Sequence, residues 1–189
     1  MIVAFKPPFL LVHDDGNNQD TLQARVNGYL QLNQNKYPAQ AIHRIDYETS
    51  GLVLFCKHPF FQAYCDKNKE YIALVQGHTN YKNKKIISNI AKDRHNAKKM
   101  IIHPNGKESV SIFNTLKNYK DCSLIQVTIL TGRKHQIRVQ CASLNHPILN
   151  DPLYGGKKID NTGLLLQSHH IQFNDVDITC PQEKRFIRK

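Results

Sequence analysis

Residues 43–52 constrain the fold and chemistry of this chain more than any other segment. They read His-Arg-Ile-Asp-Tyr-Glu-Thr-Ser-Gly-Leu, and they lead into an apolar run, Gly51 to Phe55, that is typical of a buried strand. The polar turn before that strand would hold Asp46 rigidly beside Arg44. An arginine can bind phosphate while a nearby carboxylate does chemistry, so the segment predicts a site for a polyanionic substrate. A surface turn with an Arg–Asp ion pair explains these ten residues alone equally well.

An excess of positive charge favours an anionic partner. The 189 residues include 26 Lys and Arg but only 15 Asp and Glu, which gives a formal net charge of +11. Nucleic acid is the first partner to expect for such a chain, although a basic surface without a partner stays open. No apolar run approaches the ~20 residues of a membrane span, and the apolar stretch at the N-terminus is too short for a signal peptide. We therefore expect a soluble, cytoplasmic protein that does not contact membranes.

The five cysteines form no CxxC pair, and several lie in apolar stretches. They are interpreted as reduced thiols in the core, rather than as a disulfide framework or a zinc site. The residues are Cys56, Cys65, Cys122, Cys141 and Cys180.

The length suits one domain, residues 1–189, and the pattern of elements predicts its class. Many strands with few helices between them indicate an α+β fold, with a mixed, largely antiparallel central sheet and flanking helices. Residues 80–99 are expected to be exposed and partly irregular, because they are rich in lysine and show little apolar periodicity. Strands are predicted at residues 2–5, 9–13, 51–57, 71–75, 109–116, 123–130, 164–166 and 171–173. Helices are predicted after the N-cap Asp20, from Pro59 to about Asp66, and from His135 to Leu144.

Nucleotide-binding motifs such as GxGxxG and GxxxxGK[ST] are absent, but three longer motifs occur in order along the chain. The first is the segment that begins at His43. The second is Lys69–Gly77, which reads KEYIALVQG. The third is Thr131–Val139, TGRKHQIRV, and it continues as HPILNDPLYG over His146–Gly155.

These motifs resemble the RluA family of pseudouridine synthases, and the resemblance covers nearly the whole chain. The family pattern is H-R-[LI]-D-x-x-T-S-G-[LI], then K-x-Y-x-A-L-V-x-G, then T-G-R-x-H-Q-I-R and G-H-P-I-x-G-D-x-x-Y-G. The segments Lys6–Pro8 and Leu164–Ser168 are also similar to family segments. Asn150 stands where glycine is expected, and Gln167–Ser168 stand where His-Ala is common. No S4-type RNA-binding extension is seen, so a stand-alone member with the pseudouridine synthase fold is expected.

The resemblance implies that a uridine in ribosomal or transfer RNA is isomerised to pseudouridine. The N1–C1′ bond breaks, the base turns, and C5 bonds to C1′, so no cofactor is required. Asp46 corresponds to the family's nucleophile, and whether it attacks the sugar or the base stays open. Tyr71 corresponds to a tyrosine that stacks on the base and helps to remove the C5 proton. Arg138 corresponds to the basic partner of the aspartate.

RNA-binding roles are expected for three further residues. Arg44 corresponds to the arginine that inserts where the extruded base stood, because the reacting bond is inaccessible inside a base stack. Arg133 and Lys134 lie at a strand-to-helix turn, where they would bind phosphate together with the helix N-terminus. The expected partner is a compact RNA stem-loop with splayed bases, and the protein is expected to act as a monomer.

A metal site is not predicted. His43, His135 and His146 lack the spacing of metal ligands and are interpreted as structural hydrogen-bonding groups. Two alternative functions remain open. One is a non-catalytic RNA-binding or ribosome-assembly factor with the same fold, and the other is a metal-dependent nuclease that would use Asp46, Glu48 and Asp151.

Overall fold

The computed structural model describes residues 1–35, 37–57, 67–173 and 176–188. The strands are β1 (Ile2–Lys6), β2 (Gln40–Ala41), β3 (Ser50–Cys56), β4 (Lys67–Gln76), β5 (Lys84–Lys92), β6 (Met100–Ile102), β7 (Lys107–Asn118), β8 (Cys122–Ile129), β9 (Leu166–Phe173) and β10 (Val176–Thr179). The helices are α1 (Leu22–Leu32) and α2 (Gln136–Ser143), with short 3-10 helices η2 (Pro152–Tyr154) and η3 (Lys184–Phe186).

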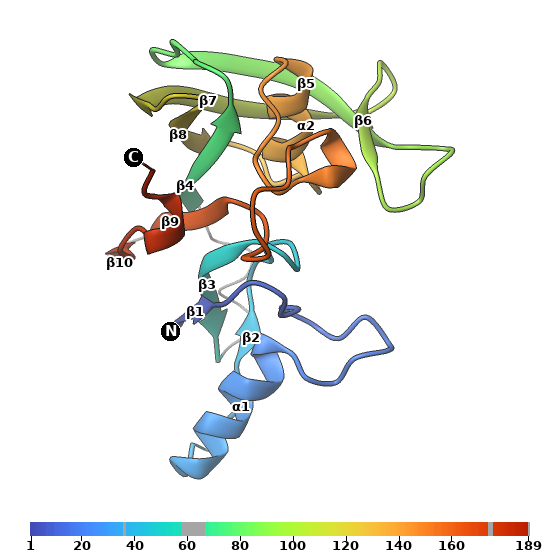
Figure 1. The fold of residues 1–189 in the computed structure, drawn as a ribbon. Helices are drawn as coiled ribbons and strands as arrows, with labels where there is room; N and C mark the ends of the chain where they lie inside the picture. Colours follow the sequence, from blue (N-terminus) through green and yellow to red (C-terminus); the bar gives the residue numbers. More distant parts are fainter. Residues whose placement is uncertain (36, 58–66, 174–175, 189) are drawn as a thin grey trace.

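All ten described strands belong to one sheet (Figure 1). The order is β1-β3-β9-β4-β8-β7-β5-β6, while β2 pairs with β3 and β10 pairs with β9. The contact between β3 and β9 is parallel, and every other pair of described strands is antiparallel. The predicted α+β class with a mixed, largely antiparallel sheet is therefore confirmed.

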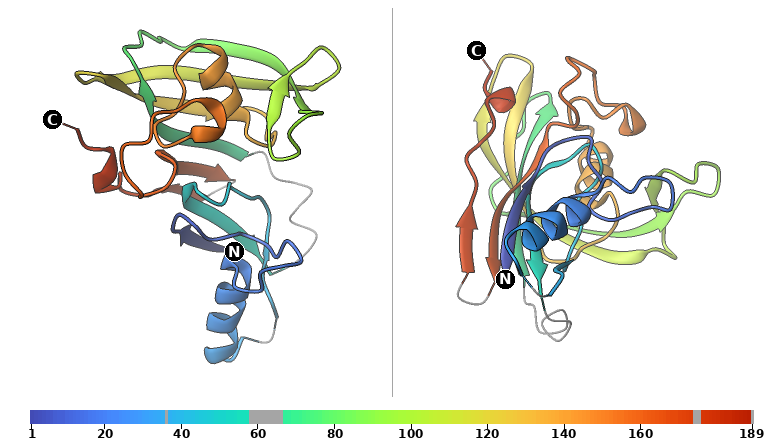
Figure 2. Two further views of the ribbon diagram at one scale, coloured as in Figure 1. Left: turned by 45° about the vertical axis from the view of Figure 1, so that its right-hand side comes forward. Right: turned by 90° about the horizontal axis from the view of Figure 1, so that it is seen from below.

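The two α-helices cover different ends of the sheet. Figure 2 shows α1 beside β1 and β3, and α2 beside β5, β7 and β8. Leu22, Val26 and Leu30 form the buried face of α1 and join the main core, which also contains Val53 and Phe55 of β3. Every residue of β3 is buried, which explains why its sequence is a continuous apolar run and not an alternating one.

Gly51 permits the close approach of β3 and β9, which pair in parallel. Its φ of 114° lies in the region that side chains disfavour, and a Cβ atom there would lie 2.2 Å from the backbone oxygen of Ser168. This close approach joins the two halves of the sheet directly after the loop that carries Asp46. The backbone conformation and the close approach of Ser168 therefore require glycine at this position of the first motif.

Two predicted boundaries were wrong near the N-terminus. Residues 9–13 do not form a strand. The chain turns at residues 8–9, where Phe9 adopts a left-handed φ of 62°, and Leu11 makes only an isolated bridge to Thr21. Helix α1 is capped by Thr21 and not by Asp20: the Thr21 hydroxyl accepts a hydrogen bond from the Ala24 amide at 3.1 Å.

Three further expectations concern the middle and the end of the chain. The region 80–99, predicted to be partly irregular, contains β5, which pairs with β7; the exposed lysines of β5 obscure the strand pattern. The strands predicted at 164–166 and 171–173 are wrong as separate elements: one strand, β9, runs from Leu166 to Phe173 through polar residues. The helix predicted from Pro59 to Asp66 lies outside the described residues.

The described cysteines are free and buried, as predicted for reduced core thiols, and Cys65 lies outside the described residues. Within the described part of the chain, no helix combines the length and the apolar character needed to cross a membrane.

Candidate active site

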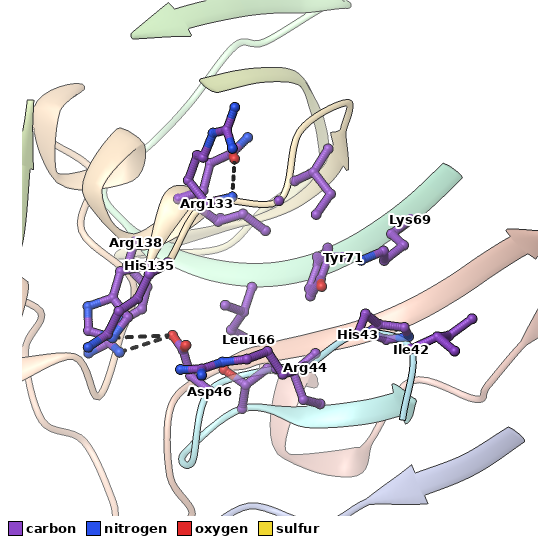
Figure 3. Close-up of a pocket in the computed structure, with 17 residues that line it drawn as sticks. Ile42, His43, Arg44, Asp46, Lys69, Tyr71, Arg133, His135, Arg138 and Leu166 are labelled. Atoms are coloured by element: carbon purple, nitrogen blue, oxygen red, sulfur yellow. Dashed lines mark hydrogen bonds and ion pairs between the residues drawn. The ribbon is translucent and has the colours of Figure 1, made fainter. Parts of the chain in front are cut away.

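A cavity of about 490 Å³ opens between the loop that precedes β3, strand β4 and the turn into α2 (Figure 3). The structure brings all six residues singled out in the sequence to this one cavity, although they come from distant parts of the chain. They are Arg44, Asp46, Tyr71, Arg133, Lys134 and Arg138. Their roles stay predictions, but their convergence provides the geometry from which those roles can be argued.

The loop that carries Asp46 is fixed by one backbone–backbone hydrogen bond and one from a backbone amide to a side chain. The Asp46 carbonyl accepts from the Thr49 amide at 3.1 Å, which closes the turn. His43 Nε2 accepts from the Leu54 amide at 3.1 Å, so His43 ties the start of the loop to β3. The carboxylate of Asp46 is thereby presented from a rigid turn, with 21% of its side chain exposed.

Lys6 supports the same loop, a role that was not predicted from the sequence. Its side chain is fully buried, and Nζ donates to the carbonyls of Pro7 at 2.9 Å, Leu10 at 2.8 Å and Tyr47 at 3.0 Å. Burial lowers the pKa of Lys6 to about 8, although the nearby charge of Asp46 raises it. A buried ammonium group thus joins β1 to the residue that follows Asp46.

Arg138 connects two carboxylates in the cavity wall. Its Nη1 donates to Asp46 Oδ2 at 3.2 Å, while Nε and Nη2 each donate to Asp151 at 2.8 Å. Arg138 is 4% exposed and Asp151 is fully buried. Burial opposes the charge of Arg138, but the hydrogen bonds and charges of the two carboxylates raise its pKa above the ordinary value. Asp151 therefore holds the guanidinium in the orientation that directs its remaining nitrogen at Asp46.

His135 also faces Asp46. Its Nε2 lies 3.8 Å from Asp46 Oδ2, and its Nδ1 is 2.9 Å from the Tyr154 hydroxyl. Burial lowers the pKa of His135 to about 4, helped by the positive charges of Arg138 and Lys134, while Asp46 acts in the opposite direction. The imidazole is therefore neutral at physiological pH, and Arg138 supplies the positive charge beside Asp46. The sequence assigned His135 only a structural role, and Tyr154 none.

Substituting His135 should change how stability depends on pH. The unfolded histidine takes up a proton near pH 6.5, and the folded one only near pH 4, so the unfolded state binds more protons between these values. The free energy of unfolding should thus decrease as the pH falls through this window, by up to about 3 kcal/mol from this group. His135→Asn keeps a residue that tolerates the φ of 54° but cannot titrate. We expect urea unfolding to show a smaller decrease in the variant; equal decreases would contradict this.

Tyr71 lines the cavity from β4 and is 6% exposed. Burial, together with the charge of Asp46, raises the pKa of its hydroxyl above the ordinary value. The side chain is therefore a neutral phenol. Such a ring offers a flat apolar face and a hydroxyl, and it can accept a proton through oxygen only after it has first lost its own.

Gln136 shapes the turn that carries Arg133 and Lys134. Its side-chain oxygen accepts from the Thr131 hydroxyl at 2.9 Å and from the Arg133 amide at 3.0 Å. Arg133 Nε donates to the Glu108 carbonyl at 2.8 Å (Figure 3 shows its side chain at the cavity margin). Both cationic side chains are exposed, as phosphate binding would require.

The nuclease alternative gains no support from this geometry. Asp46, Glu48 and Asp151 all face Arg138, with Glu48 Oε2 at 3.9 Å from Nη2, so a guanidinium takes the place that a metal ion would need. Across the residues that the structure describes, no group of three or more His, Cys, Asp or Glu side chains could hold a metal ion.

Comparison with known proteins identifies the family of the chain. Residues 1–143 match the model of the RNA pseudouridylate synthase family. The chain therefore belongs to this family, and the RluA-type family predicted from the motifs is confirmed. A structure of human RNA Pseudouridylate Synthase Domain Containing 4 superposes with a TM-score of 0.78 at 18% identity, covering 97% of this chain and 86% of that one. This likeness shows that the fold is shared.

Two relatives show which members of the family the chain is similar to. An uncharacterized RNA pseudouridine synthase of Bacillus subtilis, YhcT, is 34% identical, in a match that covers 82% of this chain and 55% of the relative. Ribosomal large subunit pseudouridine synthase D of Borreliella burgdorferi is 32% identical, in a match that covers 99% of this chain and 61% of the relative. This chain thus spans less than two thirds of the length of either relative.

Proposed function

We propose that this protein is an RNA pseudouridine synthase that isomerises specific uridines in ribosomal or transfer RNA. The observation that carries the proposal is Asp46, presented from a rigid turn and held at 3.2 Å by a buried arginine inside a cavity. The family of the chain supplies the reaction, and the name of the Borreliella burgdorferi relative favours a ribosomal substrate.

Asp46 acts as the nucleophile in this proposal. The reaction breaks the N1–C1′ bond, forms a C5–C1′ bond, removes the proton from C5 and returns a proton to N1, so atoms balance without a cofactor. Arg138 orients the carboxylate of Asp46, because guanidinium and carboxylate attract and hydrogen-bond directionally. His135, as a neutral imidazole, contributes no second positive charge that would weaken the nucleophile.

Tyr71 provides the surface on which the uracil ring stacks. Base–aromatic stacking contributes ~1–3 kcal/mol per base, and a buried ring is already ordered before the base arrives. We retain the proposal that its hydroxyl assists removal of the C5 proton. Since the phenol is neutral, that assistance requires the hydroxyl to pass its own proton on or to act through hydrogen bonding.

The three remaining cationic residues bind the RNA itself. Arg44 is exposed beside Asp46 and would fill the space left by the extruded uridine, at a flipping cost of roughly a few kcal/mol that binding offsets. Arg133 and Lys134 would hold phosphates at the cavity margin, which predicts that affinity falls steeply with salt. The cavity, at about 490 Å³, lies in the ordinary size range of ligand sites.

Tritium release from RNA that contains 5-tritiated uridine tests the proposal. Each isomerisation frees the tritium at C5, so the purified protein should release it from total RNA of a strain deleted for the gene. RNA binding without any tritium release would favour the alternative, a non-catalytic RNA-binding or ribosome-assembly factor.

Tyr71→Phe separates stacking from proton removal. The variant keeps the ring and loses only the hydroxyl, so RNA affinity should stay within about twofold, while the turnover rate should fall by about 10²-fold or more if the hydroxyl assists the proton. Single-turnover rates and filter binding on the same RNA provide the two measurements. Unchanged turnover would refute the role of the hydroxyl and leave stacking as the contribution of Tyr71.

A further inference from the structure

Two aromatic side chains next to the catalytic loop are exposed and paired. Phe9 is 48% exposed and Tyr47 is 47% exposed, and their rings meet edge to face with centroids 5.9 Å apart. Phe9 also adopts a φ of 62°, a conformation that is strained for a bulky residue and that glycine would adopt freely. Burial in the core accounts for neither the exposure nor the strain. A strained, solvent-facing aromatic residue points to a functional use.

The pair is held rigidly. The Phe9 amide donates to the Tyr47 carbonyl at 2.8 Å, and the buried Lys6 ammonium donates to the same oxygen at 3.0 Å. Two segments that are far apart in the sequence are thus joined directly beneath the rings. A preordered surface binds a ligand with little further loss of conformational entropy.

The position of the pair links it to the candidate active site. Tyr47 lines a second cavity of about 650 Å³, which shares Arg44, Asp46, His135 and Arg138 with the first. The two cavities therefore meet at the proposed nucleophile. Tyr47 is the next residue in the sequence, and the Phe9 ring lies against Tyr47. An RNA strand whose target nucleotide occupies the first cavity would place the neighbouring nucleotide in the second cavity.

The charged residues of the second cavity allow a nucleobase to bind in one part of it and a phosphate group in another. Arg44, Lys98 and Lys134 line it and can hold the RNA backbone, whereas the carboxylates of Asp14, Asp15 and Glu48 repel phosphate but not a neutral nucleobase. Aromatic faces stack on any base, so they need no sequence-specific contact.

We propose that Phe9 and Tyr47 form a stacking platform for an unpaired nucleobase that neighbours the target uridine. The inference rests on the proposed function, because it assigns to the same RNA the nucleotide next to the one that reacts. Extruding a uridine separates it from its stacking neighbour, and the platform would replace that lost contact. The substrate class is therefore RNA with splayed, single-stranded nucleotides around the target, and not continuous duplex.

Phe9→Gly tests the platform, because glycine removes the ring and relieves the backbone. Affinity is measured in an Asp46→Asn background for a stem-loop RNA with one loop uridine, and for matched RNAs in which either neighbour of that uridine is abasic. With the ring present, one abasic neighbour should weaken binding by about tenfold. In Phe9→Gly the intact RNA should bind about tenfold more weakly, and the abasic change should then have no further effect.

Controls separate stacking from structural damage. The thermal midpoint of Phe9→Gly should not fall below that of the parent, since the strain is removed. Tyr47→Leu should weaken binding as Phe9→Gly does, and Tyr47→Phe should restore it. Tyr29→Ala removes a tyrosine of helix α1 that is 67% exposed and lines neither cavity, and it should leave affinity unchanged.

The platform would be overturned if an abasic neighbour weakened binding equally in the parent and in Phe9→Gly. It would also be overturned if Phe9→Gly bound the intact RNA as tightly as the parent does. The latter result would leave the aromatic pair as a surface for another macromolecule. Because binding is measured without turnover, a wild-type protein that releases no tritium would refute the proposed function separately, while a ring-dependent abasic effect would still establish the platform.

Discussion

Asp46→Asn is expected to abolish pseudouridine formation, with a fall of at least about 10³-fold in the single-turnover rate. The amide has nearly the shape of the carboxylate but lacks its charge and its nucleophilic oxygen pair. Arg138 keeps its two hydrogen bonds to Asp151, so the cavity should retain its form. RNA affinity should therefore remain within a few-fold of wild type, and the loss should appear in the chemical step.

A matched control is Asp121→Asn, which removes an exposed carboxylate outside both cavities and should leave the rate unchanged. Rates that are similar for Asp46→Asn and wild type would mean that Asp46 is not the nucleophile. A large loss of RNA affinity in the variant would instead assign Asp46 to binding.

Arg138→Met is expected to cause the largest loss of stability among substitutions at the site. Asp151 is fully buried, and Arg138 donates two hydrogen bonds of 2.8 Å to it. Removing one partner of a buried ion pair leaves an uncompensated charge, which typically costs about 3–5 kcal/mol. Urea unfolding at neutral pH should show this decrease in the free energy of unfolding, and pseudouridine formation should be lost because Asp46 is no longer oriented.

The double variant Arg138→Met, Asp151→Leu separates the two effects. With both charges replaced by apolar groups, most of the lost stability should return, because apolar replacements of a buried pair are often neutral. Activity should not return, since nothing orients Asp46. Recovery of activity in the double variant would show that Arg138 serves only the fold.

The fold could be predicted where local pattern and packing agree. Strands β3, β7 and β8 have continuous or alternating apolar residues, and the structure has them within a few residues of the predicted bounds. Strand β5 was missed because it is half-exposed, and lysines occupy positions that a core strand would fill with apolar residues. The turn at Phe9 was missed because an aromatic residue with positive φ carries no local signal.

The convergence of the site could be anticipated only through the family motifs. Asp46 and Arg138 are 92 residues apart, and no local pattern brings them together. The partners that position them were assigned no such role, because their significance depends on tertiary contacts. Asp151 faces Arg138, the Tyr154 hydroxyl meets His135, and the Lys6 ammonium joins three carbonyls. The sequence Lys-Pro-Pro does not reveal that the charged side chain of Lys6 is buried.

Chemical mapping of pseudouridine tests most directly whether Asp46 isomerises uridine in RNA. Ribosomal and transfer RNA from cells deleted for the gene would be incubated with the purified protein and mapped at single-nucleotide resolution. We predict new pseudouridines at discrete loop positions with the wild-type protein and none with Asp46→Asn. If the wild-type protein binds these RNAs but leaves every uridine unchanged, it is not a pseudouridine synthase for them, and the proposed role of Asp46 is wrong.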